Sequence, residues 1–350
     1  MDTYLIGLDI AKNVFTAHAI DRTGKPLFRK KLSRSELLPF FASIPVSAIA
    51  MEACGGAHHW AREFQKLGHQ TQLLPAQHVK PFLRGQKNDM RDAQAIAEAA
   101  LMPTMHRVPT KSVEQQTILS LHRLRTGWVE ERTALSNRIR GLLAEFGVAI
   151  GQGLSVLRNK LPRILQESDL PALLRTGVER CRLHFLALDA EIAQVERDIQ
   201  SWHLQHEQSK RLADIPGIGM LTATQVVALI GNGAQFRNGR HFAAWVGLVP
   251  RQYSTGGVTR LGHISKRGSI HLRSLLIHGA RTVIRWLIQK PDAKTSVRYR
   301  WILELLKRMH PNKVAVALAN RQARTVWNML HYNTLYNKVD PSVKTAFAGI

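Results

Sequence analysis

Short apolar runs separated by turn residues characterise the first third of the chain. Each run has the length of a strand, and a Gly-containing turn at residues 21–24 separates the second run from the third. Between the later runs, apolar residues recur at helical spacing instead. Three consecutive strands followed by alternating helix and strand predict an α/β N-terminal domain with a mixed sheet. The predicted strands cover residues 4–10, 14–20, 26–32, 48–52 and 71–74.

Helix start signals follow some of these strands. Ser33 is expected to cap a helix that runs to about Ser43, and Asn88 or Asp89 can cap a later one. In the later helix, small and apolar residues recur at helical spacing around Ile96. This spacing indicates that a helix opens at Asn88 or Asp89.

The middle third has a different pattern, with apolar residues at heptad-like steps. They recur between Leu121 and Phe146 and again between Leu188 and Ile199, on either side of a Gly-containing break at 147–153. Two long helices with an apolar seam predict an antiparallel coiled-coil hairpin that acts as a spacer or dimerises. A helical bundle within a single domain is the alternative interpretation.

The last third reads as mainly helical. It opens with a hydrophobic-Pro-Gly-hydrophobic-Gly turn at 214–219, which is typical of a helix-hairpin-helix element. In such turns Gly217 and Gly219 would let backbone amides approach a phosphate. A tight turn between two helices explains the same residues without a phosphate. An apolar segment, Phe242–Val249, then leads into a polar loop, and a basic helix is expected from Ser269.

These patterns divide the chain into three domains and a tail. We expect an α/β catalytic domain over residues 1–110, a helical coiled-coil linker over 111–205 and a mainly α C-terminal domain over 206–335. Residues 336–350 are expected to form a flexible tail.

Charge points to the class of partner. The 350 residues include 49 Lys and Arg against 25 Asp and Glu, a formal charge of +24. Residues 251–350 alone hold 18 basic and 3 acidic residues. Such an excess favours a polyanionic partner, nucleic acid before an anionic membrane surface.

The cysteines and the hydropathy of the chain indicate the cellular compartment in which the protein works. The 2 cysteines, Cys54 and Cys181, have no metal-ligand spacing, which suits a reducing compartment. The chain shows no signal-peptide pattern and no apolar run long enough to span a membrane. We therefore expect a cytoplasmic, nucleoid-associated protein with no membrane partner.

Four carboxylates follow predicted strands or open a helix. Asp9 lies near the end of the first strand, where a charge is costly unless it is paired or binds a metal. Glu52 ends the fourth strand, and Asp89 and Asp92 share one face of a helix start. In an RNase H-like sheet the first and fourth strands are adjacent, so these groups would suit two Mg²⁺ ions about 3.5–4 Å apart. Mn²⁺ would suit the same ligands, and helix-start acids without a metal are the alternative.

A second candidate group is the serine loop, Tyr253–Gly257. The hydroxyl of Ser254 or Thr255, beside flexible glycines, could attack a phosphodiester. Basic side chains nearby could neutralise the transition state and bind the nucleic acid, although a solvated surface loop would look the same on composition. These candidate nucleic-acid ligands are Arg251, Arg260, Lys266, Arg267 and Arg273.

Several motifs together resemble a known family, the DEDD transposases of the IS110 insertion-sequence family. The resemblance covers residues from about 4 to about 330. The motifs that carry it are Gly7–Lys12, Met51–Ala53, Asn88–Ala93, Ile215–Gly219 and Ser254–Arg273.

The resemblance implies a RuvC-like N-terminal domain, a coiled-coil linker and a C-terminal transposase domain. It implies that Asp9, Glu52, Asp89 and Asp92 bind Mg²⁺ while a serine forms a covalent 5′-phosphoserine with DNA. It also implies a structured bridge RNA that pairs with donor and target DNA, and homodimers or homotetramers whose sites assemble between protomers.

The nucleophile position departs from the family pattern. Alignment on the following glycine selects Thr255, whereas residue identity selects Ser254. We favour Ser254, because the extra methyl of threonine restricts its χ1 angle. Two other functions remain open: a RuvC-like structure-specific endonuclease that uses water, and a nucleic-acid-binding scaffold with an inert acidic set.

Overall fold

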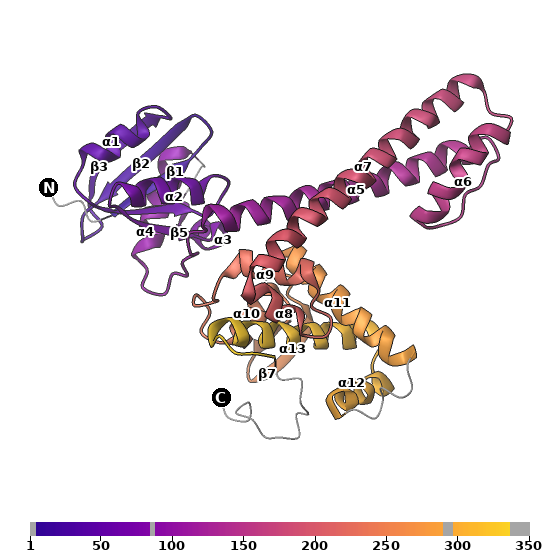
Figure 1. Cartoon of the computed structure of the whole chain (residues 1–350). Helices are drawn as coiled ribbons and strands as arrows, with labels where there is room; N and C mark the ends of the chain where they lie inside the picture. The colour runs from indigo at the N-terminus through magenta and orange to yellow at the C-terminus, as the bar shows by residue number, and fades with distance from the viewer. Residues whose placement is uncertain (1–4, 85–87, 290–296, 337–350) are drawn as a thin grey trace. The chain divides into compact units, whose positions relative to one another are not determined.

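The computed structural model describes residues 5–84, 88–289 and 297–336 and falls into two compact units, Met1–Val113 and Glu114–Ile350 (Figure 1). Nearly all of the tail expected at 336–350 lies outside the described residues. In the described part of the chain, no helix is both long enough and apolar enough to cross a membrane.

A five-stranded mixed sheet forms the centre of the first unit, in the order β3-β2-β1-β4-β5. β1, β2 and β3 form an antiparallel meander, and β4 and β5 add to β1 in parallel. This confirms the mixed α/β prediction, and the order is consistent with an RNase H-like sheet. The strands are β1 (Leu5–Ile10), β2 (Val14–Ile20), β3 (Pro26–Ser33), β4 (Ala48–Glu52) and β5 (Gln70–Leu74).

Helices cover both faces of this sheet. α1 and α2 bury Phe41 and Phe64 against one face, together with Phe15 of β2. α4 buries Ile96 and several alanines against the other face. The helices of this unit are α1 (Leu37–Ser43), α2 (Ala57–Lys66), α3 (Ala76–Val79), the 3₁₀ turn η1 (Lys80–Phe82) and α4 (Asp89–Leu101).

The helix expected from Ser33 begins four residues later, at Leu37. Ser33 instead ends β3, and both its amide and its hydroxyl donate hydrogen bonds to the Glu36 carboxylate, at 2.8 and 2.7 Å. This local turn uses the side chain that would have capped the helix, so the prediction of Ser33 as the N-cap was wrong.

Three helices begin the second unit, where two were expected. α5 (Val113–Ala144) and α7 (Ala172–Gln205) run antiparallel, as the ion pairs Arg125–Glu196 and Arg132–Asp189 show (Figure 1). The unpredicted α6 (Leu154–Glu167) packs on both of them.

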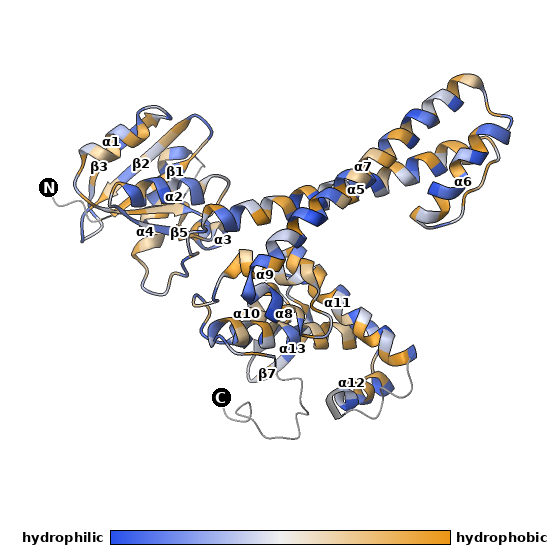
Figure 2. Cartoon of the chain, in the orientation of Figure 1, coloured by the Kyte–Doolittle hydropathy of each residue, from blue (hydrophilic) through white to orange (hydrophobic). Residues whose placement is uncertain are grey.

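Burial along α5 follows the expected seam only in part. Leu135 and Ile139 are buried as expected, but Leu124 and Phe146 are each 48% exposed. Leu143, which the expected seam does not include, is buried against α6 and α7, and Phe146 lies beyond the end of α5. Figure 2 shows hydrophobic and hydrophilic residues alternating around α5 and α7, which is typical of amphipathic helices.

The rest of the second unit is a helical body with one core. Leu276 of α11 and Val326 of α13 are fully buried in it, with Phe242 of α10. Its helices are α8 (Glu207–Ala213), α9 (Met220–Ile230), α10 (Gly239–Val246), α11 (Ile270–Gln289), α12 (Val297–Arg308) and α13 (Pro311–His331).

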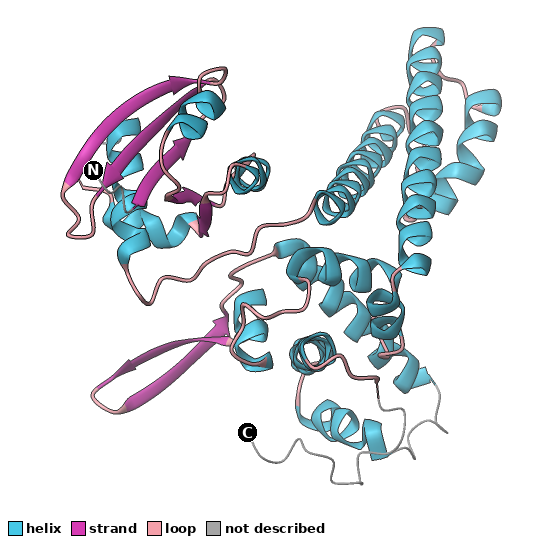
Figure 3. Cartoon of the chain, turned by 60° about the vertical axis from the view of Figure 1, so that its left-hand side comes forward, coloured by secondary structure: helices cyan, strands magenta, loops and turns pink. Residues whose placement is uncertain are grey.

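The polar loop expected after Pro250 is a β-hairpin. β6 (Pro250–Thr255) and β7 (Val258–Ile264) pair antiparallel around a Gly256-Gly257 turn and extend away from the helices of this unit (Figure 3). A Gly-Gly pair between two short runs that contain Tyr, Thr and Val is a hairpin signal that the loop interpretation overlooked. Every residue of β6 is exposed, so the strand has no buried face that would give it an alternating hydrophobic pattern.

Candidate active site

Three carboxylates of the first unit come together at the end of β1. Oxygen atoms of Asp9, Asp89 and Asp92 all lie within 4.8 Å of one another. Asp9 and Asp92 are half-buried, and Asp89 is exposed. Converging carboxylate oxygens are ligands for a hard divalent cation, because without one their like charges repel.

The start of α4 positions two members of this group. Asn88 caps the helix, and its side-chain oxygen accepts a hydrogen bond from the Arg91 amide at 2.9 Å. The cap places Asp89 and Asp92 in the first turn, three residues apart on one face. The sequence signal for this helix start therefore also predicts the pair of ligands.

Gly7 explains how α4 comes so close to β1. A Cβ atom at Gly7 would lie 2.2 Å from the Ala93 carbonyl oxygen and 2.6 Å from the Ala97 amide. Glycine in the strand and alanines on the helix therefore permit a backbone contact that carries the α4 carboxylates to Asp9, two residues further along β1. Sequence reasoning missed this role of Gly7, although a glycine inside a strand often marks a close backbone approach.

Glu52, the fourth predicted ligand, lies outside the group of three. The parallel register pairs Leu8 with Met51, so Glu52 follows beside Asp9 at the same end of the sheet. Burial, followed by the negative charge of Glu52 and then that of Asp9, raises the pKa of the Cys54 thiol. Both carboxylates are therefore close enough to Cys54 to act on it, and this thiol stays protonated at neutral pH.

The two candidate nucleophiles lie on the β6–β7 hairpin of the second unit. Ser254 is paired with Thr259 and accepts a hydrogen bond from the Gln252 side chain at 2.8 Å. Ser254 and Thr255 are consecutive strand residues, so their side chains leave opposite faces of the hairpin. Only one of the two hydroxyls can therefore face a given phosphodiester.

Four of the five candidate cations on this segment are exposed: Arg251, Arg260, Lys266 and Arg267. Arg273 differs, because only 7% of it is exposed and burial lowers the pKa of its guanidinium. Its Nη1 donates hydrogen bonds to the carbonyl oxygens of Val246 at 2.9 Å and Arg267 at 2.8 Å. The structure thus gives Arg273 an anchoring position at the base of the hairpin instead of a surface position.

Two glycines complete this anchor. Gly247 and Gly268 both have positive φ, 83° and 67°. A Cβ at Gly247 would lie 2.5 Å from the Arg267 amide nitrogen, and one at Gly268 would lie 2.0 Å from the Trp245 carbonyl oxygen. The end of α10 and the chain after β7 are therefore in backbone contact. We call Gly247, Gly268 and Arg273 the hairpin anchor.

The two glycines of the 214–219 turn have different surroundings. Gly217, with φ 86°, packs on α11, where a Cβ would lie 2.7 Å from the Gly279 carbonyl oxygen. Gly219 is exposed at the N-cap of α9, with nothing within 4 Å of a Cβ. The close packing on α11 is enough to explain why residue 217 is a glycine. The predicted contact with a phosphate can be tested at Gly219, which is exposed.

Comparisons with known proteins agree with these observations. The model described as "Transposase IS116/IS110/IS902 family" matches residues 209–298, and a DEDD transposase model matches residues 6–147. A probable family 20 transposase of Pseudomonas aeruginosa is 46% identical over 96% of this chain and 99% of its own length.

Two further relatives are named for their insertion sequences. The transposase of IS1111A from Coxiella burnetii is 40% identical over 96% of this chain and 92% of its own. The transposase of IS1328 from Yersinia enterocolitica is 39% identical over 95% and 98%. Matches of this extent make the chain a member of the IS110/IS116/IS902 family of insertion-sequence transposases, enzymes that cleave DNA and transfer its strands.

Proposed function

We propose that this transposase is a Mg²⁺-dependent, serine-type recombinase that cuts and rejoins DNA through a covalent phosphoserine. The observation that carries the proposal is the convergence of Asp9, Asp89 and Asp92 within 4.8 Å. Glu52, beside Asp9 in the sheet, would be the fourth ligand. When bound, Mg²⁺ (or Mn²⁺) at such a site polarises a phosphodiester and stabilises the leaving oxygen.

In this proposal Ser254 is the nucleophile. Its Oγ forms a bond to phosphorus, the bond from phosphorus to the 3′ oxygen breaks, and the serine proton ends on the released 3′ hydroxyl. The product is a 5′-phosphoserine, which conserves the energy of the phosphodiester for rejoining. Exposure of the hairpin supports the proposal, because the hydroxyl must reach a duplex.

The finer architecture is also proposed. A RuvC-like N-terminal domain over 1–110, a coiled-coil linker over 111–205 and a transposase domain over 206–335 agree with the family resemblance. The 214–219 turn would act as a helix-hairpin-helix element. The excess of 18 basic over 3 acidic residues in 251–350 supports contacts with DNA and a bridge RNA. Dimers or tetramers would let one protomer supply carboxylates and another the serine.

A covalent adduct is the decisive test. The full chain is incubated with Mg²⁺, its RNA and a nicked DNA substrate, then denatured and analysed for protein-linked DNA. We expect an adduct that disappears with Ser254→Ala, with Asp92→Ala and on chelation of the metal. Thr255→Ala is the matched control and should retain the adduct.

Other outcomes select the alternatives. An adduct that survives Ser254→Ala but not Thr255→Ala would transfer the role to Thr255. Cleavage without any adduct would indicate a RuvC-like endonuclease with water as the nucleophile. Tight DNA binding without cleavage, unaffected by Asp9→Ala, would indicate a scaffold.

A further inference from the structure

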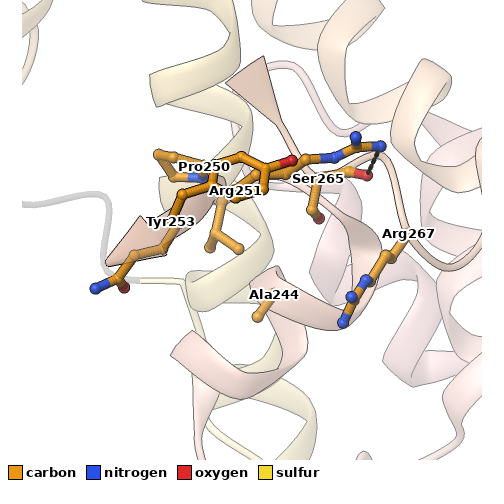
Figure 4. A pocket seen from close by; sticks show the side chains of 8 residues that line it. Ala244, Pro250, Arg251, Tyr253, Ser265 and Arg267 are labelled. Carbon is orange, nitrogen blue, oxygen red and sulfur yellow. Dashed lines mark hydrogen bonds between the residues drawn. The ribbon is translucent and has the colours of Figure 1, made fainter. Parts of the chain in front are cut away.

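A cavity of about 460 Å³ lies at the base of the β6–β7 hairpin (Figure 4). Ala244 of α10, together with Val249 and Pro250, gives it an apolar wall, and Tyr253 adds an aromatic ring. The volume is within the range of about 300–1,000 Å³ that is usual for small-ligand sites. An apolar wall beside an aromatic ring is suited to a planar base.

The charged part of the lining is wholly cationic. Arg251 and Arg267 both line the cavity, and none of its lining residues is acidic. Among the described residues, the guanidinium of Arg251 has a single hydrogen bond, a long one of 3.5 Å to the Ser265 carbonyl oxygen (Figure 4). Arginine binds phosphate oxygens bidentately, so this side of the cavity favours a phosphodiester.

Hydrogen bonds to the backbone fix the chain segments at the base of the cavity. The Ser265 amide donates to the Val249 carbonyl at 2.8 Å and joins the two chain segments that form its walls. Arg273 ties the Arg267 carbonyl to the end of α10, as part of the hairpin anchor. A site fixed by backbone loses little conformational entropy when a ligand binds.

We propose that this cavity binds a single nucleotide of the DNA strand on which the hairpin acts. The base stacks on Tyr253 against the apolar wall, and its phosphodiester lies on Arg251 and Arg267. The inference rests on the proposed function, because Gln252, which also lines the cavity, donates a hydrogen bond to the hydroxyl of the proposed nucleophile, Ser254, at 2.8 Å. Ser254 would then attack a phosphodiester next to a nucleotide that the cavity holds in place.

Photocrosslinking tests the contact without any chemistry on DNA. The Ser254→Ala chain is irradiated with single-stranded DNA that carries 5-iododeoxyuridine, and cross-linked peptides are mapped by mass spectrometry. We expect a cross-link at Tyr253. Ala244→Trp, which fills the cavity, and Arg267→Gln should each lower its yield at least about tenfold, in line with the energy of base stacking and phosphate contacts.

Arg308→Gln is the charge-matched control, because Arg308 is an exposed residue of the last turn of α12. It should leave the yield unchanged, and thermal melting checks that every variant folds. Cross-links only at other residues, or a Tyr253 cross-link that both cavity variants retain, would overturn the proposal. So would an iodouridine RNA that reacts with Tyr253 in preference to the DNA.

The two proposals fail separately. An adduct through Ser254 in the unmodified chain, with no cross-link at Tyr253, would refute the cavity assignment and leave the recombinase proposal intact. A cavity-dependent cross-link without any adduct would support nucleotide binding and count against the serine mechanism.

Discussion

The carboxylate group and the hairpin are built in opposite ways. Asp9, Asp89 and Asp92 project from a strand and a helix that are in backbone contact at Gly7. Ser254 projects from a two-stranded ribbon in which every residue of β6 is exposed. The first region takes its geometry from a buried core, and the second from an anchor at its base alone.

This difference fits the two tasks that the proposed reaction requires. Metal ligands must hold positions within a fraction of an ångström, which only a packed scaffold provides. A nucleophile that enters a duplex needs reach, and an isolated hairpin is of marginal stability in water. We therefore expect substitutions in the first region to act through folding and metal binding, and those in the hairpin to act on reactivity.

Gly7→Val should have the largest effect. Its side chain would overlap the backbone of α4, so the free energy of unfolding of the first unit should fall by more than about 3 kcal/mol. Thermal melting and DNA cleavage measure the loss. Gly55→Ala is the control, because a Cβ there meets nothing within 4 Å. Normal stability of Gly7→Val would show that α4 does not need this close approach.

Asp9→Asn should abolish metal binding while the unit stays folded. We expect DNA cleavage to fall at least about a hundredfold, since a bound metal contributes several kcal/mol to such reactions. The unmodified chain should melt at a higher temperature with Mg²⁺, and the variant should not. Glu63→Gln on α2 is the control, because Glu63 is a half-buried carboxylate outside this group. A variant that still gains stability from Mg²⁺ would place the metal elsewhere.

Arg273→Met tests the anchor of the hairpin. The substitution leaves the carbonyl oxygens of Val246 and Arg267 without their hydrogen-bond donor, which should cost about 2–3 kcal/mol of stability. Urea unfolding measures the loss. Arg260→Met removes an exposed arginine of β7 and should leave stability unchanged. Equal stability of the two variants would argue that Arg273 is no anchor.

Acid should destabilise the second unit through His122, which is 2% exposed. Burial, then the charges of His271 and Arg125, lowers the pKa of His122 from 6.5 to about 3. The unfolded chain binds a proton below about pH 6.5 and the folded chain does not, so stability should fall as the pH drops toward 3. The slope should be at most about 1.4 kcal/mol per pH unit.

His122→Gln should flatten this dependence between about pH 6.5 and 4. The control is His278→Gln, an exposed residue of α11. His271 faces His122 at 5.7 Å between ring centroids, and burial and Arg125 lower its pKa while Glu130 raises it. Its smaller contribution should remain in the variant. An unchanged slope in His122→Gln would contradict the prediction.

Gly256→Ala should have the smallest effect. Its φ of 55° is unfavourable for alanine by about 1–2 kcal/mol, but a Cβ meets nothing within 4 Å. The turn alone should open, so global melting stays constant while adduct formation slows about fivefold to tenfold. Gly177→Ala in α7 should instead stabilise slightly. A large loss of global stability would mean that the hairpin belongs to the core.

Much of the first unit follows from local pattern. Strand runs and the Asn88 cap predict the sheet and α4 almost residue by residue, because each signal acts within a few positions. The second unit was less predictable. α6 had no distinct signal beside its longer neighbours. The exposed hairpin has no buried face, so its Gly-Gly turn is the signal that the sequence offers for it.

The sequence alone determined the family, which carboxylates are candidate metal ligands, and the excess of positive charge, because these depend only on the identity and order of the residues. Only the tertiary structure decided which carboxylates converge, that Gly7 permits this, and that Arg273 anchors the hairpin from a buried position. These facts depend on contacts between segments far apart in sequence. A glycine's missing side chain or an arginine's partner is visible only when the other segment is in place.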